Sequence, residues 1–503
     1  MAMQMRSAAS ALSFLLAMAS ASAHEARAQS RVLIRNATII DGTGAPRRAG
    51  AVRLVGNRIT EVGILQPSIG ETVIDAQGLA LAPGFIDTHS HHDGGLFGRR
   101  DALAMVSQGV TTIVVGQDGG GINLAALFAR VDTQPPAVNV ASYAGHGAIR
   151  RAVLGTDFKR VATPSEVERM KALLKTEMDA GALGLSSGLE YDPGIYSATD
   201  ELLALAKTAA DAGGRYISHI RSEDRFFWSA IDEIISIGRV NHMPVQVSHI
   251  KLGMMDLWGQ TDSLIHVLDR ARGAGVQITA DIYPYTYWQS NFGVFYPKRN
   301  FADSAETAFI LAHLSPPDGI IFNTFSRHPE YQRKTLAEVA VLRGVTPTRA
   351  MLDLLAEPGG PSVGVVARGM ADADVFKLAA WPWANICSDG VSTGVHPRGF
   401  GSFARVAGLF TREKGLFSLE EAVRKMTSLA AANVGLQGRG LIQPGMAADL
   451  VLFDPATIAD RATFEAPQAT AVGVRYVWVN GEVVFEGGAP TSRYPGQALR
   501  RAR

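Results

Sequence analysis

The sequence is poor in cysteine, with Cys387 alone among 503 residues. One thiol cannot form an intrachain disulfide, so packing must stabilise the fold. Hydrophobic residues make up 47% of the chain, which is enough at this length to bury one large core or two. The composition therefore favours a folded, globular chain over a disordered one.

An excess of either charge is also absent, since 48 Lys and Arg residues stand against 47 Asp and Glu residues. Nucleic acids and anionic membrane surfaces are bound through a positive field, which a net charge of +1 does not supply. We therefore expect a small-molecule partner and no nucleic acid. The sequence predicts no particular oligomeric state.

Long apolar runs are missing as well, so we expect no membrane span. Residues 1–28 instead carry Arg6, then a short apolar run, then small residues, which is the pattern of a secretory signal peptide. We expect cleavage after Ala23 or Ala28 and a periplasmic or secreted protein. The alternative is a disordered or interfacial leader.

What is present at both ends is a β-strand pattern. Residues 31–80 alternate apolar and polar side chains around Asp-Gly and Gly-Asn turns, and residues 438–490 do the same around an Asn-Gly hairpin. Two β-rich ends around a different middle predict one small β-sandwich domain built from both.

Residues 81–437 alternate short apolar runs with helical stretches that often end in Gly. The strand candidates are GFIDTHSH, TTIVVGQDG, NVASYAGHG, ALGLSSGLE, RYISHIRSE, PVQVSHIKL, VQITADIYPY and ANICSDG. Eight strands with crossover helices predict an α/β fold of the TIM type, a (β/α)8 barrel. A doubly wound open sheet is the alternative, but no G-x-G-x-x-G loop follows the first strand.

One interval breaks this rhythm, because more residues separate the seventh and eighth strands than one crossover helix needs. We expect an insertion at about 290–380 beside the mouth of the barrel. Its aromatic and proline content favours a lid or substrate wall. A passive surface excursion or an oligomer contact is the alternative.

Polar residues follow most of the apolar runs, at the face where such barrels assemble their active sites. In DTHSHHD, His89 and His91 lie two apart at a strand end, so both side chains point to one side and can bind one metal ion. His92 points the other way, and we expect it to be structural or to support the ligands. Alone, an H-x-H pair is weak evidence.

Three further residues strengthen the metal hypothesis. His219 and His249 close two later strands, and Asp389 closes the last one. Imidazoles and a carboxylate on one rim suit zinc, which lowers the pKa of water and polarises carbonyls. The pattern therefore predicts hydrolysis, with Asp389 as both a metal ligand and the proton acceptor and donor. The alternative for Asp389 is a helix N-cap or loop residue.

A site for two ions also needs an anionic bridge. Glu190, at the end of the fourth strand, is the candidate, and no Lys lies there to be carboxylated instead. Asp118, after the second strand, is the rival ligand. For Asp118 a structural turn within GQDGGG is an equal alternative.

These residues together resemble the amidohydrolase superfamily and, within it, the D-aminoacylase (N-acyl-D-amino-acid deacylase) branch. The matching stretches include GFIDTHSHHD, GVTTIVVGQDGG, AGHGAIRRAVLG, GALGLSSGLEYDPG, SHIRSE, VSHIKLG and SDGVSTGVHPRGFGSFARV. The resemblance covers about residues 31–490. It implies a barrel with a small β-sandwich, a late insertion and one or two zinc ions.

The resemblance also implies roles for single residues. His89 and His91 would hold one metal, His219 and His249 the other, and Asp389 would be the catalytic acid and base. The better-known members carry a metal-binding Cys in an N-C-G sequence on strand two, where this chain has Gln117-Asp118-Gly119. We infer that the bridging ligand has moved to Glu190.

For the substrate carboxylate, the resemblance points to Lys251, Tyr283 and Arg398. Arg binds carboxylates in a bidentate manner, which suits an acyl-amino acid. Lys251 could instead be a solvated loop residue, and Tyr283 a packed aromatic. His146, in AGHGAIRR, could touch substrate or merely pack.

The leading hypothesis is an exported zinc enzyme that cleaves the amide bond of N-acyl amino acids, with the D configuration expected. A dipeptidase or cyclic-amide hydrolase on the same scaffold is one alternative. A non-catalytic periplasmic binding protein that retains the fold is another.

Overall fold

The computed structural model describes residues 30–502. The predicted signal peptide at 1–28 therefore lies outside the described residues. Among the residues that are described, no helix is both long and apolar enough to cross a membrane.

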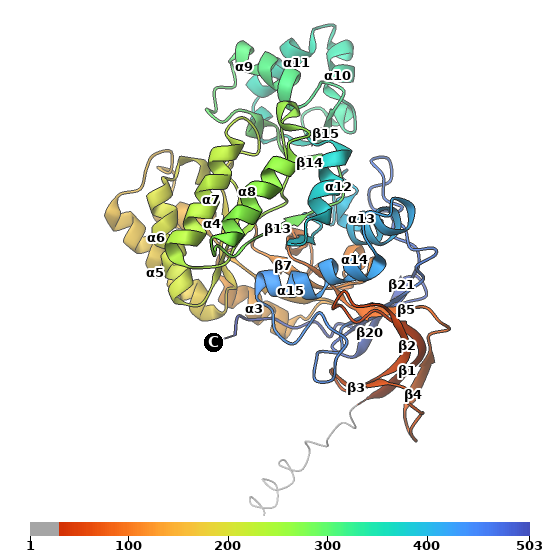
Figure 1. Cartoon of the computed structure of the whole chain (residues 1–503). Helices are drawn as coiled ribbons and strands as arrows, with labels where there is room; N and C mark the ends of the chain where they lie inside the picture. The colour runs from red at the N-terminus through yellow and green to blue at the C-terminus, as the bar shows by residue number, and fades with distance from the viewer. Residues whose placement is uncertain (1–29, 503) are drawn as a thin grey trace, which may run out of the picture.

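Both chain ends meet in one nine-stranded sheet (Figure 1). The N-terminal part supplies β1 (Arg31–Ile39), β2 (Arg48–Val55), β3 (Arg58–Gly63), β4 (Thr72–Asp75) and β5 (Ala80–Pro83). The C-terminal part supplies β18 (Leu450–Phe453), β19 (Val474–Val479), β20 (Glu482–Glu486) and β21 (Ala489–Pro490). Antiparallel pairing of β5 with β18 joins the two parts. Hydrogen bonding is thus continuous, and the curved sheet encloses a core of its own around Trp478.

The middle of the chain forms the barrel. Its strands are β6 (Phe85–Asp87), β7 (Val110–Val115), β8 (Asn139–Ser142) with β9 (Ala144–Gly145), β10 (Gly184–Gly188), β11 (Arg215–His219), β12 (Val245–Val247), β13 (Ile278–Ile282) and β17 (Ala384–Ile386). All pair in parallel with their neighbours. A parallel bridge between Ser90 and Gly390 joins the first strand to the last. The prediction of a (β/α)8 barrel is confirmed.

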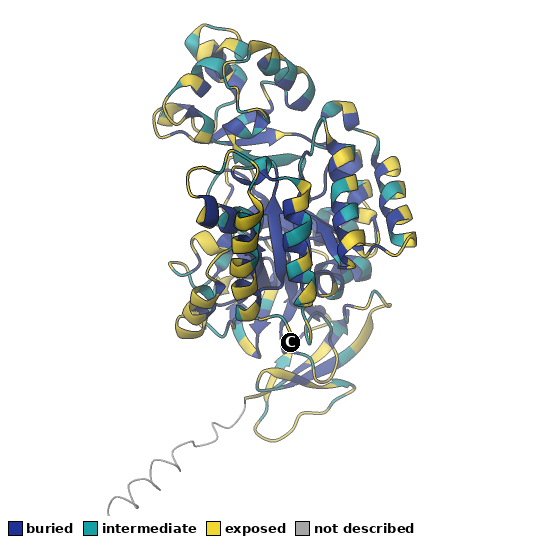
Figure 2. Cartoon of the chain, turned by 90° about the vertical axis from the view of Figure 1, so that its left-hand side faces the viewer, coloured by how far each residue is buried: buried dark blue, intermediate teal, exposed yellow. Residues whose placement is uncertain are grey.

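Helices cover the barrel from outside, and Figure 2 shows the buried strands within this layer of half-exposed helices. They are α2 (Leu103–Val106), α3 (Leu124–Thr133), α4 (His146–Leu154), α5 (Pro164–Ala180), α6 (Thr199–Asp211), α7 (Phe227–Asn241), α8 (Thr261–Gly273), α12 (Asp372–Ala380), α13 (Arg398–Arg405), α14 (Leu419–Met426) and α15 (Ser428–Val434).

Local sequence explains where α5 begins and ends. The Thr163 side chain accepts a hydrogen bond from the Glu166 backbone N–H, and the Glu166 carboxylate accepts one from the Thr163 N–H. Pro164 occupies the first turn, where its missing N–H costs nothing. Gly181 ends the helix with φ 112°, a left-handed conformation that side chains disfavour.

An insertion between β13 and β17 stands over the mouth of the barrel (Figure 1). It contains β14 (Tyr287–Asn291), β15 (Ile320–Thr324) and β16 (Gly364–Arg368) in one antiparallel sheet, with the helices α9 (Ser304–Phe309), α10 (Leu336–Arg343) and α11 (Pro347–Ala356). The following helix, α12, packs against the barrel strands β13 and β17. The insertion therefore ends near residue 370, before the predicted boundary at about 380.

Candidate active site

The predicted histidines meet at the carboxyl ends of the barrel strands. Potential ligand atoms of His89, His91, Asp118 and Asp389 all lie within 4.8 Å of one another. Those of Asp118, His219 and His249 form a second such group. Because only Asp118 belongs to both groups, they form a single centre with this carboxylate in the middle.

The Asp118 carboxylate spans the two groups. Its Oδ1 atom lies 3.5 Å from His89 Nε2 and 3.5 Å from His249 Nε2, and its Oδ2 atom lies 3.3 Å from His91 Nε2. Burial alone would raise the pKa of Asp118, but the neighbouring histidines His89, His91 and His249 lower it well below its usual range. Asp118 is therefore an anion placed to bridge two cations.

Several buried polar atoms of this centre have no hydrogen-bond partner within residues 30–502. They include both ring nitrogens of His89 and Oδ1 of Asp118. Buried polar atoms are rarely left unpaired, and unpaired ones require an explanation such as a bound ion. Imidazole nitrogens and carboxylate oxygens suit zinc, so these residues fit the metal that the sequence predicts.

Glu190 does not lie between these two groups, and its potential ligand atoms form a third group with those of His219 and Glu223. Its Oε2 atom is 3.0 Å from His219 Nε2, whereas His219 Nδ1 faces His249 Nε2 at 3.1 Å. The His219 ring thus stands between Glu190 and the centre. Burial also raises the pKa of Glu190. The geometry contradicts Glu190 as the bridge and favours its rival, Asp118, because the Glu190 side chain leaves β10 on the other side of the ring.

Asp389 lies next to the first histidine pair. Its Oδ1 atom is 3.6 Å from His89 Nε2 and 3.3 Å from His91 Nε2, and its Oδ2 atom accepts a hydrogen bond of 2.6 Å from Arg398. Burial would raise the pKa of Asp389, but Arg398 and the histidines lower it well below its usual range. At neutral pH this carboxylate is ionised and able to accept a proton.

Three of these residues have left-handed backbone conformations. The φ angles are 52° for Asp118, 34° for His249 and 47° for Asp389. Non-glycine residues rarely adopt such angles, and they persist where the surrounding structure holds them in place. Each occurs just after a barrel strand ends, so the turn in the backbone directs the side chain toward the other ligands at the mouth of the barrel.

The loop that carries Asp118 has no room for larger residues. A Cβ atom on Gly121 would lie 2.2 Å from the Tyr143 carbonyl oxygen, and one on Gly145 would lie 2.3 Å from the Gly119 oxygen. The glycine run after Asp118 is therefore required for backbone packing against β8 and β9. The turn that was the alternative to metal ligation is present, and it places the Asp118 carboxylate among the histidines.

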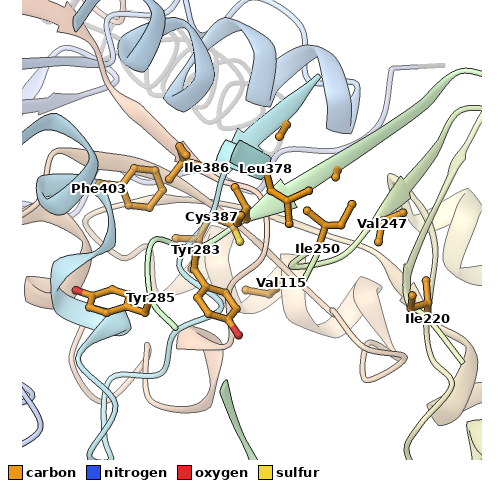
Figure 3. Close-up of a cluster of buried hydrophobic side chains, with 14 of the residues drawn as sticks. Val115, Ile220, Val247, Ile250, Tyr283, Tyr285, Leu378, Ile386, Cys387 and Phe403 are labelled. Atoms are coloured by element: carbon orange, nitrogen blue, oxygen red, sulfur yellow. The ribbon is translucent and has the colours of Figure 1, made fainter. Parts of the chain in front are cut away.

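The predicted carboxylate-binding residues also converge. The Arg398 guanidinium lies 4.7 Å from the centre of the Tyr283 ring, and the Lys251 ammonium lies 5.8 Å from it. Figure 3 shows the Tyr283 hydroxyl at the end of the ring that points away from Cys387. It is buried without a hydrogen-bond partner in the described chain, and burial raises its pKa well above the usual value, so it remains a donor.

His146 is not part of this arrangement. Its side chain is fully buried at the start of α4, and Nε2 lies 2.8 Å from the carboxylate of Glu201, which also pairs with Arg150. The substrate-contact prediction for His146 is wrong, and the packing alternative is right. His92 is buried as well, with Nδ1 2.9 Å from the Ser392 hydroxyl.

A pocket opens over the centre between the barrel and the insertion. Its barrel side is polar and includes Glu190, Glu223 and Lys251. The insertion contributes apolar side chains from β14 and the two short helical segments Phe292–Phe295 and Ile310–Leu314, namely Trp288, Val294, Phe295 and Leu314. The insertion is therefore a wall of the pocket.

Sequence reasoning missed two acidic residues of the site. Glu223 lies four residues past His219 in SHIRSE and contacts both Lys251 and His249. Asp281 is fully buried on β13, accepts a 2.5 Å hydrogen bond from the His249 backbone N–H, and lies 3.9 Å from His89 Nδ1. Asp281 could have been found, because it is a polar residue near the end of a barrel strand.

A family profile described as "Amidohydrolase family" matches residues 72–309 and 332–485. This chain belongs to the amidohydrolase family. The resemblance seen in its sequence is thereby confirmed, and the fold and the cluster of histidines and carboxylates agree with it.

Three proteins are similar to this amidohydrolase over almost its whole length. The D-aminoacylase of Alcaligenes xylosoxydans xylosoxydans is 35% identical over 93% of this chain and 97% of that protein. The N-acyl-D-aspartate deacylase of the same organism is 36% identical over 94% of this chain and 96% of that protein. A crystal structure of N-acyl-D-glutamate deacylase from Bordetella bronchiseptica, complexed with zinc and a phosphonate inhibitor, matches at a TM-score of 0.84 and 35% identity, covering 94% of this chain and 99% of that one.

Proposed function

We propose that this amidohydrolase hydrolyses the amide bond of N-acyl-D-amino acids and releases a carboxylate and the free D-amino acid. The observation that carries the proposal is the pair of histidine groups joined by Asp118, with Asp389 beside them. All three relatives named above are deacylases or acylases of D-amino acids.

Each residue has a defined task in this reaction. His89, His91, Asp118, His219, His249 and Asp389 would hold one or two zinc ions, which supply Lewis acidity toward water and the amide carbonyl. Asp389 accepts the proton of the attacking water and returns it to the leaving nitrogen. Lys251, Arg398 and the Tyr283 hydroxyl are the donors for the substrate carboxylate.

A paired measurement tests the function. Purified enzyme is analysed for zinc and assayed with N-acetyl-D-amino acids, their L enantiomers, dipeptides and hydantoins. We expect bound zinc and hydrolysis of the D series. Neutral, aspartyl and glutamyl side chains all belong in the screen, because the names of the three relatives differ in the side chain they specify, at 35% to 36% identity. Turnover of cyclic amides alone would disprove the proposal.

We also propose that residues 1–28 are a signal peptide and that the enzyme works in the periplasm or outside the cell. The support is the charged, apolar and small-residue order of this segment. Mass spectrometry of the protein from a fractionated host is expected to show a mature N-terminus after Ala23 or Ala28. An intact Met1 in the cytoplasmic fraction would contradict this.

A further inference from the structure

Each histidine of the second group must present an unprotonated nitrogen to a metal ion. A neutral imidazole carries one proton, so the partner of its other nitrogen decides which nitrogen is free. His249 directs Nε2 toward Asp118, and His219 directs Nδ1 toward His249. The two opposite nitrogens, His249 Nδ1 and His219 Nε2, must then carry the protons.

The environment of His249 Nδ1 contains two competing groups. The Glu223 Oε1 atom lies 3.0 Å from it and can accept its proton. The Lys251 ammonium lies 2.7 Å from it and can only donate. Donation from Lys251 would place the His249 proton on Nε2, where it would point at Asp118 and block metal binding.

Glu223 resolves this competition, because its Oε1 atom also accepts a 2.5 Å hydrogen bond from Lys251. One carboxylate oxygen thus binds the ammonium and also lies 3.0 Å from Nδ1, within reach of a proton there, whereas the hydrogen bond formed at Nδ1 is the one with Lys251. Removing its negative charge would weaken its hold on Lys251, and the other acceptor of that ammonium is the Nδ1 lone pair, 2.7 Å away.

Glu190 performs the matching task for His219. Its Oε2 atom lies 3.0 Å from His219 Nε2 and accepts that proton, which leaves Nδ1 free. The Tyr191 hydroxyl lies 3.2 Å from Nδ1, but a hydroxyl can rotate away from this contact. The Glu223 backbone N–H donates to Glu190 Oε1 at 2.7 Å, which ties the Glu190 carboxylate to the loop that carries Glu223.

We infer that Glu223 and Glu190 are positioning residues that fix the tautomers of His249 and His219, and that Glu223 does so by keeping Lys251 away from His249 Nδ1. This inference rests on the metal-dependent function proposed above. Its readout is metal affinity, so it can fail or succeed independently of which substrate the enzyme hydrolyses.

The test is zinc affinity, measured on full-length purified protein by competition with a chelator and repeated with Co²⁺ by visible absorption. For Glu223→Gln we expect zinc binding about 10- to 100-fold weaker at unchanged stoichiometry, the usual effect of losing such a partner. Glu190→Gln is expected to act in the same direction. Glu357→Gln, in the insertion, is the control and should bind zinc as the parent does.

The decisive variant combines Glu223→Gln with Lys251→Met. Because the competing donor is gone, we expect this double variant to recover most of the lost affinity. If the double variant binds zinc as weakly as Glu223→Gln alone, the role assigned to Lys251 is wrong. A loss of stoichiometry in Glu223→Gln would show a direct ligand and overturn the inference. If Glu223→Gln does not fold, Glu223→Ala, alone and combined with Lys251→Met, gives the same comparison.

Discussion

Asp118→Asn is expected to reduce the zinc bound per chain and to lower kcat/KM by about 10³-fold. The amide keeps the shape of the side chain but loses the charge that the two histidine groups share. Loss of several kcal/mol of electrostatic stabilisation corresponds to such a factor. Elemental analysis and steady-state kinetics measure the two effects.

Asn is the matched replacement because it tolerates the left-handed backbone of position 118 nearly as well as Asp does. Glu190→Gln provides the comparison, since it should retain the zinc content of the parent when zinc is in excess. If Asp118→Asn kept the full zinc content and Glu190→Gln did not, the sequence-based assignment of Glu190 as the bridge would be restored.

Asp389→Asn is expected to lower kcat by about 10²- to 10⁴-fold, the range for removal of a general acid and base. It also leaves the buried Arg398 without its carboxylate partner. Since the defect is in proton transfer, the KM for an N-acetyl-D-amino acid should change much less than kcat. A variant with near-normal kcat would exclude Asp389 as the proton carrier.

The pairing of Asp389 with Arg398 also leads us to expect a change in the pH dependence of kcat. Arg398 lowers the pKa of Asp389, so the base form persists as the pH falls below the usual carboxyl range. Removal of the guanidinium in Arg398→Gln raises this pKa. The acidic limb of the kcat profile of the variant should therefore move to higher pH, which a profile at saturating substrate measures.

The barrel and the histidines could be predicted because they follow a repeating rule. Each apolar strand is short, each is followed by a helix, and parallel strands bring their carboxyl ends to one rim. His89, His91, His219, His249 and Asp389 all obey this rule, and the structure brings them together.

The carboxylate that bridges the two histidine groups could not be predicted from the sequence. Its identity depends on the direction in which a side chain points after its strand has ended. Asp118 turns inward through a left-handed residue in a glycine-rich loop, and Glu190 passes behind His219. Glu223 was missed for a related reason, since it lies in a loop beyond β11. His146 follows a strand as the ligands do, but it is buried at the start of the helix α4 and pairs with Glu201.

The joining of the two chain ends governs the order in which this enzyme can mature. Strands β1–β5 are synthesised first, yet β5 finds its partner β18 only when residues 450–453 appear. Until then β5 is an unpaired edge open to association with other chains. All the candidate ligands lie before residue 390, but a nascent chain that contains every one of them still lacks the strands that complete its sheet. Truncated chains that stop before β18 therefore contain every candidate metal ligand but cannot pair the free edge of β5.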